Sequence, residues 1–478
     1  MILWLGSLFL GVILAYIINH FLLKAKSGQK NFPPLVKRIE NDASAHEKFV
    51  KNPTSFLREN LKTHGEIFTI EMKKGLFQTY LFDVQNIHHI LHSKKTDFLP
   101  ISAQSKQRFG LKKSLNHLDL FTKVLKQALS ISNVHELFLR FEQNLCNYLT
   151  ALPSTPTLMK LLNDFVCKTV LKAAVDTLFG KSVYYDNLGE DFLDYNNSMS
   201  PRVAGSNPDT ADSGKRAKEK LKVALSTSIP GIYEQNKFLQ IVKRDFVDVV
   251  LNDVEDREEE IDLLLLLLWG AFNNSLATSF WIIAHVVGST EARSTILDET
   301  DVIFETGKGS VAENLKSLPK TRAIIQEVFR IRARPSILRF AMEDIDLEIS
   351  GKMVTIPKGH WISLFPKLLY EDEQVFQEAN RFHFNRFFPD KDGRSPTFFM
   401  NEKEIPERII RSLLVFGDGR FRCPAYDFMG GILKIMVAVI VQNINMTIMQ
   451  QIPESLVESV SSVPGPATDV EIFLSKAK

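Results

Sequence analysis

The sequence predicts a mainly α-helical protein with a minor β portion, preceded by one transmembrane helix at the N-terminus. Three observations support this fold class: an apolar run over Met1–Leu23, mostly helical patterning from about Val84 to Ser289, and short alternating segments that suit two β-hairpins. The chain has 478 residues, of which 45% are hydrophobic and 24% are charged. This is an ordinary globular composition, which excludes wholesale disorder. Because no low-complexity linker interrupts the chain, we expect one large domain and not three of about 150 residues each.

The net charge and the number of cysteines exclude several classes of protein. Fifty-eight Lys and Arg against 56 Asp and Glu give a net charge of +2. This is far from the basic excess of nucleic-acid-binding domains, so we expect no nucleic-acid partner. The three cysteines, Cys146, Cys167 and Cys423, are too few and too scattered for a disulfide scaffold or a thiolate zinc site. They suit a reducing compartment.

The first segment predicts a membrane anchor. Residues Met1–Leu23 are almost entirely apolar, and a helix of that length, at about 1.5 Å per residue, exceeds the ~30 Å of bilayer hydrocarbon. Lysines such as Lys24 and Lys26 follow the run instead of preceding it. This order argues against a cleaved signal peptide and keeps the body of the chain in the cytosol. Pro33-Pro34 would then form a stiff joint. We therefore predict a transmembrane anchor over 1–23, a linker with a proline hinge over 24–48, and a folded body over 49–478.

The body is predicted to begin with a helix and a hairpin. Phe49–Lys62 is patterned as a helix, whereas Ile67–Lys73 and Gln78–Phe82 alternate on either side of Lys74-Gly75, which suits a hairpin turn. A long helical region follows. It is broken once, at Ser198–Gly214, where Pro, Gly, Asn and Asp cluster as in a surface loop.

The second half contains the longest apolar helix candidate, Ile261–Val287. Acidic residues before its leucine run and two asparagines after it indicate the start of a buried helix and not a second membrane span. Leu318–Ala333 is a further helix, with Pro319 in the first turn, where proline is tolerated. Leu347–Ile356 alternates around a Ser-Gly turn as a second hairpin. After a loop-rich stretch, a helix spans about Pro424–Val441.

The most informative string is Phe-Gly-Asp-Gly-Arg-Phe-Arg-Cys-Pro-Ala at residues 416–425, which opens this last helix. Its two glycines permit positive φ and a close approach of the backbone. For Cys423, the free N–H groups and the positive dipole end at a helix start favour thiolate over thiol, and the neighbouring arginines act in the same direction. Such a cysteine could be a nucleophile, a redox sensor or a metal ligand. No protease signature accompanies it, and the string favours an iron–thiolate ligand.

A second pattern lies upstream. Glu327 and Arg330 are at i and i+3 on one face of a predicted helix, which taken alone is a common surface pair. Arg386 is bracketed by phenylalanines in Phe-His-Phe-Asn-Arg-Phe, residues 382–387. That setting suits a buried guanidinium that needs a carboxylate partner. We therefore expect Glu327, Arg330 and Arg386 to form a structural three-charge cluster under the Cys423 loop.

These three strings, in this order and spacing, resemble the cytochrome P-450 superfamily of haem-thiolate monooxygenases, and the resemblance covers the whole chain. It implies the cytochrome P-450 fold and haem b as the cofactor, with Cys423 as the axial ligand of the iron. It also implies that Glu327, Arg330 and Arg386 lock the loops on the same side of the haem. Arg339 matches the family's haem-propionate arginine. The haem-binding residues that the resemblance implies are Cys423, Arg339, Arg420, Arg422, Phe416, Gly417 and Gly419.

The central helix resembles one branch of that family. Residues 269–281 read Trp-Gly-Ala-Phe-Asn-Asn-Ser-Leu-Ala-Thr-Ser-Phe-Trp, with Asn273 and Asn274 where most members carry an acid–threonine pair. This arrangement resembles the sterol and oxysterol 7α-hydroxylases, sterol 12α-hydroxylase and prostacyclin synthase, and the Cys423 string is most similar to that of the oxysterol 7α-hydroxylase. The resemblance implies that Asn273 and Asn274 are catalytic and that Ala271 and Phe272 face the substrate. The Asn274 amide can hydrogen-bond dioxygen or water but cannot itself relay protons readily; helix packing is its alternative role.

Several positions depart from the family pattern. Phe421 stands where most members carry an arginine two residues before the cysteine, so that one propionate contact must come from elsewhere. Ala277 replaces the proline of the branch, and His383-Phe384 replaces Asp-Pro before Arg386. These are the marks of a distant member.

The resemblance implies a monooxygenase that inserts one oxygen atom from O2 into an apolar lipid, with a sterol or oxysterol as the expected substrate. The chain carries no flavin or iron–sulfur segment, so the electrons must come from outside. We expect an NADPH-dependent flavoprotein reductase, with cytochrome b5 as a second donor. The expected location is the endoplasmic reticulum membrane, with a single span and the haem-binding catalytic domain, 49–478, in the cytosol. Two alternatives stay open: a haem-thiolate isomerase or dehydratase of a lipid peroxide, which needs no reductase, and a haem-binding protein without turnover.

Overall fold

The computed structural model describes residues 32–36, 49, 52–100, 102–103, 108–199, 208–251, 256–305, 309–333, 336–400, 402–455 and 462–477. These residues form two compact units. The first unit draws its described residues from Met1–Ile101, Ser336–Leu369 and Asp418–Arg420, and the second from Ser102–Pro335, Tyr370–Gly417 and Phe421–Lys478. The anchor predicted over 1–23 lies outside the described residues, as does most of the linker predicted over 24–48.

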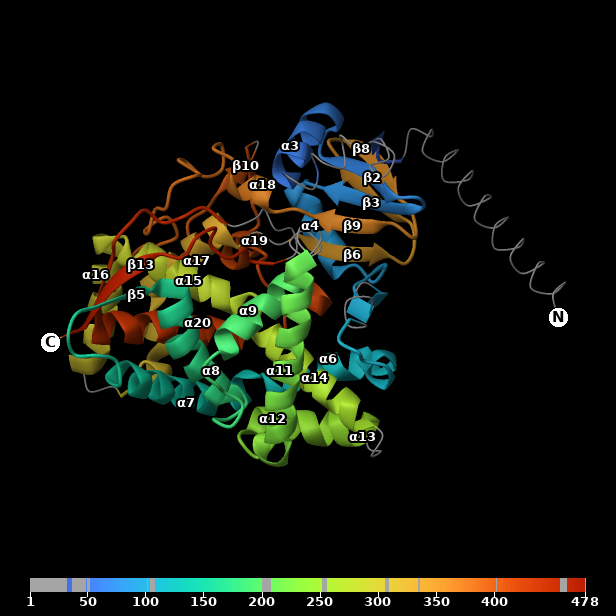
Figure 1. Ribbon diagram of the computed structural model, residues 1–478. Helices are drawn as coiled ribbons and strands as arrows, with labels where there is room; N and C mark the ends of the chain where they lie inside the picture. Colours follow the sequence, from blue (N-terminus) through green and yellow to red (C-terminus); the bar gives the residue numbers. More distant parts are fainter. Residues whose placement is uncertain are drawn as a thin grey trace, which may run out of the picture. The chain divides into compact units, whose positions relative to one another are not determined.

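The first unit contains a six-stranded sheet in the order β1-β2-β3-β9-β6-β4. Strands β2, β3, β9 and β6 are labelled in Figure 1. Strands β2 (Ile67–Lys73) and β3 (Leu76–Leu81) form the first predicted hairpin, and Gly75 takes a φ of 77° between them. Strand β3 pairs in parallel with β9, and β9 pairs antiparallel with β6. The remaining strands are β1 (Leu35–Val36), β4 (Thr96–Asp97), β6 (Ile337–Ala341) and β9 (Trp361–Leu364).

The second predicted hairpin also forms in this unit. Strands β7 (Ile345–Ile349) and β8 (Lys352–Ile356) pair antiparallel. Between them, Ser350 and Gly351 take φ values of 50° and 75°, which is the left-handed pair of a two-residue hairpin turn. Buried and exposed residues alternate strictly along β7, as expected for a strand with one face toward the core.

Side-chain caps begin two of the helices that the structure describes in the first unit. Of the helix expected over Phe49–Lys62, the part from Pro53 forms in α3 (Pro53–His64), where Asn52 caps the first turn by accepting a bond from the Ser55 N–H at 2.8 Å. Helix α4 (Val84–His92) is capped in the same way by Asp83, whose carboxylate accepts from the two N–H groups of the first turn.

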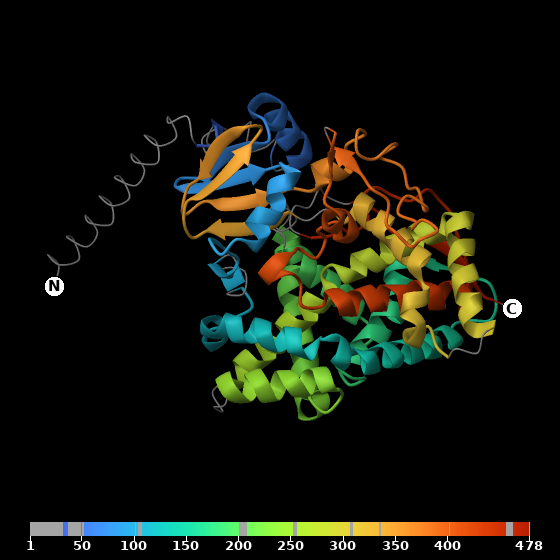
Figure 2. The ribbon, with the colours of Figure 1, turned by 180° about the vertical axis from the view of Figure 1, so that it is seen from behind.

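The second unit is mainly helical (Figure 2). Its last long helix, α20 (Tyr426–Asn443), is the one predicted after Cys423, and most of its residues are buried. Helix α17 (Pro319–Arg332) confirms the helix predicted over Leu318–Ala333, with proline in the first turn. Further helices that the structure describes in this unit include α6 (Leu118–Ala128), α7 (Ile131–Thr150), the π-helix η2 (Leu161–Val170), α8 (Leu171–Leu178), α9 (Leu188–Met199), α11 (Pro208–Ile232), α12 (Lys237–Val242), α13 (Asp248–Val250), α14 (Arg257–Phe272), α15 (Ser275–Val287), α16 (Thr290–Glu305) and α19 (Glu407–Ser412).

Short strands also pair into small sheets in the helical unit. Helix α20 runs directly into β12 (Ile444–Ile448), which pairs antiparallel with β13 (Glu471–Lys476), and β13 pairs with β5 (Thr157–Lys160). A short hairpin of β10 (Phe399–Met400) and β11 (Lys403–Glu404) lies in the preceding loop-rich stretch.

The surface loop predicted over Ser198–Gly214 was wrong at both ends, since α9 continues to Met199. Helix α11 begins at Pro208, so that Pro208–Gly214 are helical. Proline suits the first helical turn because the missing N–H would have no partner there. Gly214 serves helix packing instead of a turn, since a Cβ at this position would lie 2.1 Å from the Cβ of Ser198 in α9. Gly214 therefore lies where α9 and α11 cross, and it allows them to pack closely.

The long apolar helix predicted over Ile261–Val287 forms as two helices, α14 and α15, that meet at Asn273 and Asn274. The six leucines Leu263–Leu268 are at most 8% exposed, which confirms that they belong to a core helix. Two helical stretches among the described residues, Arg257–Val287 and Tyr426–Asn443, are long and apolar enough to span a membrane. Both stretches are mostly buried inside the protein, as expected for core helices.

Candidate active site

The Cys423 loop is shaped by its own backbone. The Cys423 N–H donates to the Phe416 carbonyl at 2.9 Å, and the Tyr426 N–H donates to the Cys423 carbonyl at 3.2 Å. Gly417 and Gly419 take φ values of 67° and 69°, which favour glycine. These contacts place Cys423 at the entrance to α20, as the sequence predicted, with its side chain half-buried.

The surroundings of the Cys423 sulfur both oppose and favour a thiolate. Burial raises the pKa of the Cys423 thiol, and this outweighs the lowering of that pKa by the Ala425 N–H and by the Arg422 cation. A metal cation on the sulfur would reverse the balance, because a coordinating thiol is deprotonated outright. A half-buried thiol with an N–H donor and a guanidinium close by therefore fits an iron ligand.

Aromatic contacts join this loop to neighbouring helices. The Phe416 ring meets the Tyr426 ring edge-on at a centroid distance of 5.3 Å, and it meets Phe329 of α17 in the same way at 5.8 Å. Arg422 lies over the Tyr426 ring, with its guanidinium carbon 3.3 Å from the centroid, and its NH2 group is 3.8 Å from the Asp427 carboxylate. Phe416 therefore links the Cys423 loop to the helix that carries Glu327 and Arg330.

Two further predicted haem-binding arginines belong to the first unit. Arg339 is 2% exposed in β6, and its NH2 group donates to the Asp418 carbonyl at 2.9 Å. Burial lowers the pKa of Arg339 to about 10, although Asp418 acts in the opposite direction. An anion beside this guanidinium would relieve that cost, so the residue fits a carboxylate of a bound ligand. Arg420 donates to the Thr96 carbonyl at 3.0 Å and lies 3.3 Å from the Asp97 carboxylate.

Glu327, Arg330 and Arg386 come together inside the helical unit. Glu327 is fully buried, and its two carboxylate oxygens accept from Arg330 at 2.8 and 2.9 Å and from Arg386 at 3.1 Å. Oxygen Oε1 also accepts from the His383 N–H at 3.1 Å. The three charges thus form the cluster that the sequence predicted, and Glu327 satisfies both cations.

Carbonyl groups complete the hydrogen bonding of this cluster. Arg330 donates to the carbonyls of Tyr370 and Ala379, both at 2.7 Å. Arg386 donates to the carbonyl of Gln377 at 2.8 Å. The two arginines therefore fix the loop over residues 370–386 to α17.

The two asparagines between α14 and α15 differ in their hydrogen bonding. The Oδ1 atom of Asn274 accepts from the Val463 N–H at 2.8 Å, so its amide oxygen holds the C-terminal segment. The Oδ1 atom of Asn273 is buried and has no hydrogen-bond partner among the described residues. A buried acceptor of this kind needs a donor such as water. The contact between Asn274 and Val463 had no signal in the local sequence, because 189 positions separate the two residues.

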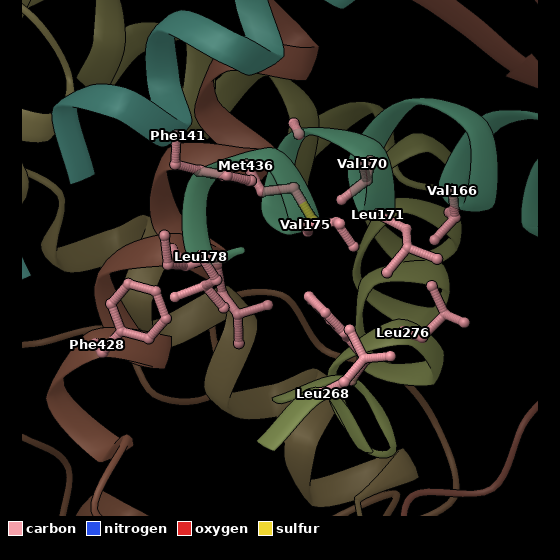
Figure 3. Packing of buried hydrophobic residues seen from close by; sticks show 14 of the residues in the cluster. Phe141, Val166, Val170, Leu171, Val175, Leu178, Leu268, Leu276, Phe428 and Met436 are labelled. Atoms are coloured by element: carbon pink, nitrogen blue, oxygen red, sulfur yellow. The ribbon is translucent and has the colours of Figure 1, made fainter. Parts of the chain in front are cut away.

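The two predicted substrate-facing residues lie beside an apolar cavity of about 30 Å³ in the helical unit. Figure 3 shows the buried side chains around this region, among them Phe141, Leu276, Phe428 and Met436. Phe272 is only 4% exposed, and its ring packs against Phe179 and Phe192. The other lining residues include Val170, Leu171, Ala174, Ala271, Ser275, Ser279, Met429 and Ile432.

Comparisons with known proteins extend these observations. A family model described as Cytochrome P450 matches residues 45–468. The chain is 25% identical over 482 residues to Cytochrome P450 7B1 of Mus musculus, which covers 95% of this chain and 91% of that protein. It is 22% identical to 24-hydroxycholesterol 7-alpha-hydroxylase of Homo sapiens, with 95% and 96% covered. It is also 24% identical to 7-alpha-hydroxycholest-4-en-3-one 12-alpha-hydroxylase of Homo sapiens, with 93% and 92% covered.

The fold has a counterpart among solved structures. Retinoic acid bound cyanobacterial CYP120A1 matches with a TM-score of 0.66 at 17% sequence identity, over 90% of this chain and 96% of that one. At this identity the likeness concerns the fold alone: mainly helical, with a smaller sheet portion.

Proposed function

Because the chain belongs to the cytochrome P450 family, we propose that it is a haem-thiolate monooxygenase that inserts one oxygen atom from O2 into a sterol or oxysterol. Membership of the family makes the chain an oxidoreductase whose cofactor is haem b, ligated by a cysteine thiolate. When bound, that cofactor supplies an oxidant strong enough for unactivated C–H bonds. The remaining chemistry falls to the protein, which must bind, orient and shield the reactants.

The observation that carries the proposal is the placement of Cys423. The loop that holds it is closed by its own backbone bond to Phe416, and Arg422 and the Ala425 N–H stand beside the sulfur. Among the three cysteines, Cys146 and Cys167 lie within helices, whereas Cys423 lies in the loop that precedes α20. We therefore assign Cys423 as the iron ligand.

Cations are proposed to hold the carboxylates of the cofactor. Arg339 is the strongest candidate, because it is buried and its pKa is already lowered by desolvation. Arg420 and Arg422 are the other candidates from the Cys423 string. Phe421 cannot donate a hydrogen bond, so one of these neighbours must take over the contact that most family members make from its position.

The two asparagines are proposed to organise water and dioxygen. The oxygen of Asn274 is already bound to the Val463 N–H, so its amide NH2 group is the part that can donate to dioxygen or water. Asn273 offers a buried acceptor that a water molecule can satisfy. Together they place one donor and one acceptor at the break between α14 and α15, with Ala271 and Phe272 next to them on the proposed substrate side.

The choice of a sterol is supported by the similar proteins, which include a 25-hydroxycholesterol 7-alpha-hydroxylase and a 24-hydroxycholesterol 7-alpha-hydroxylase. The interior around α14 and α15 is apolar, as a sterol would require. We propose an NADPH-dependent flavoprotein reductase as the electron donor, with cytochrome b5 as a second one.

A reconstituted reaction tests the proposal. The full-length chain, an NADPH-dependent flavoprotein reductase and phospholipid vesicles are supplied with cholesterol, side-chain-hydroxylated cholesterols and, as a control, a fatty acid. We expect a hydroxylated sterol that carries one oxygen atom from labelled O2 and forms only when both NADPH and reductase are present. Rearrangement of a lipid hydroperoxide without reductase, and no NADPH-dependent product, would instead indicate an isomerase. A haem-loaded protein that is inactive with every substrate would indicate a non-catalytic haem-binding protein.

We also propose that Met1–Leu23 anchors the chain in the endoplasmic reticulum membrane with the catalytic domain in the cytosol. Support comes from the length of the apolar run and from the lysines that follow it. In sealed microsomes, added protease should digest the body of the chain, because it lies on the outer side of the vesicle. Protection of the body without detergent would contradict this orientation.

A further inference from the structure

Three potential metal ligands meet in the first unit, outside the haem-binding residues proposed above. His88 and His92 lie one turn apart on α4, with ring centroids 4.1 Å from each other. The Nε2 atom of His92 is 3.2 Å from Oδ2 of Asp418, in the string that leads to Cys423. One ligand atom from each of the three side chains lies within 4.8 Å of the others. His92 and Asp418 come from positions 326 residues apart.

The spacing of these atoms suits a small divalent cation. Bonds of about 2.0–2.2 Å from a tetrahedral zinc ion to imidazole nitrogen and carboxylate oxygen place the ligand atoms roughly 3.3 Å apart. The contact between His92 and Asp418 already has this separation. Ligand atoms that lie farther apart, at up to 4.8 Å, must come closer together by a modest rotation of their side chains. His92 is 43% exposed in its side chain and Asp418 is 25% exposed, so the site is open to ions from solution and can keep a water molecule as fourth ligand.

The backbone holds the two segments together without a metal ion. A Cβ at Gly419 would lie 2.2 Å from the Leu91 carbonyl, so glycine allows the string to lie directly against the last turn of α4. Arg339 fixes the same string by donating to the Asp418 carbonyl, while His92 contacts the carboxylate. The ligand set is therefore brought together by packing, and little reorganisation is needed to bind an ion.

The charge around the site is mixed. The carbonyl groups at the C-terminal end of a helix favour a cation, and two imidazoles with one carboxylate are preferred by Zn²⁺ over Ca²⁺ or Mg²⁺. Arg339 and Arg420 oppose a cation, but Asp97 lies 3.3 Å from Arg420 and offsets it. A site with one carboxylate in this setting should bind Zn²⁺ reversibly and not as a permanent structural ion.

We propose that His88, His92 and Asp418 form a binding site for Zn²⁺ or a chemically similar divalent transition metal. Bound metal would connect the C-terminal end of α4 to the string that leads into Cys423. It would thereby restrain that string against thermal unfolding, because an ion that binds only the folded state stabilises it by mass action.

Equilibrium dialysis of the haem-loaded, full-length chain against ZnCl2 tests the site. We expect one Zn²⁺ per chain, and a binding constant that falls about tenfold or more in His88→Ala and in His92→Ala. Asp418→Asn should also weaken binding, since it keeps a hydrogen-bond partner for His92 but removes the charge. His89→Ala is the matched control, because this exposed histidine lies on the same helix but outside the cluster; it should bind Zn²⁺ like the unmodified chain.

Two further measurements make the outcome decisive. X-ray absorption at the zinc edge, which is separate from that of the haem iron, should show nitrogen and oxygen ligands and no sulfur. Zn²⁺ should raise the melting temperature of the unmodified chain and of His89→Ala, but not of His92→Ala. If His88→Ala is poorly folded, His88→Gln replaces it. Equal zinc binding in the His92→Ala variant and the unmodified chain, or a sulfur ligand at the zinc edge, would overturn the proposal.

Discussion

Replacing Glu327 by alanine is expected to leave mostly haem-free, aggregated protein. The substitution removes the only carboxylate among the described contacts of Arg330 and Arg386, and both guanidiniums would stay buried beside it. Breaking a buried ion pair by removing one partner costs about 3–5 kcal/mol. A typical domain is stable by only ~5–15 kcal/mol. The loss therefore takes a large part of the total, and the loop over residues 370–386 loses the bonds to α17 that Arg386 and the His383 N–H make through Glu327.

The measurements are haem content per chain and the thermal unfolding midpoint. Arg381→Ala provides a matched control, because Arg381 and Glu378 form another i, i+3 pair at 2.7 Å whose side chains are 76% and 50% exposed. An exposed pair of this kind contributes little, so the control should load haem normally. Recovery of Glu327→Ala as a folded, haem-loaded but inactive protein would contradict the structural role and point to a direct part in catalysis.

Features with a local physical cause were predictable from the sequence. The hairpin turns at Lys74-Gly75 and Ser350-Gly351 were predictable because few residue types accept positive φ. Helix α17 was recognisable from Pro319 in its first turn. The phenylalanines around Arg386 indicated a buried guanidinium. Its carboxylate partner is Glu327, as predicted for the three-charge cluster.

Features that depend on distant contacts were not predictable in this way. The periodicity of Ile261–Val287 shows one apolar helix, yet the chain breaks at Asn273 and Asn274, where the Asn274 oxygen holds the Val463 N–H. Gly214 looks like a loop residue until the crossing of α9 and α11 shows why a side chain cannot fit. The contact between His92 and Asp418 joins segments that share no sequence signal. In each case the partner lies outside the window in which a local pattern can be read.

Replacing Cys423 by serine is expected to abolish thiolate ligation of the haem. A serine hydroxyl remains protonated where a metal-bound cysteine loses its proton, so it cannot supply the same electron density to iron. The structure offers a matched control in Cys146, a half-buried cysteine of α7 that lies outside the Cys423 loop. Cys146→Ser removes a thiol of comparable exposure and should leave the haem site unchanged.

The absorption spectrum of the reduced protein with carbon monoxide tests the central claim most directly, namely that Cys423 is the axial ligand. The unmodified chain and Cys146→Ser should both give the band typical of a thiolate-ligated haem. Cys423→Ser should lose that band even when some haem is retained. A Cys423→Ser protein that keeps the thiolate band at full intensity would contradict the assignment, and with it the proposed haem-thiolate site at the entrance to α20.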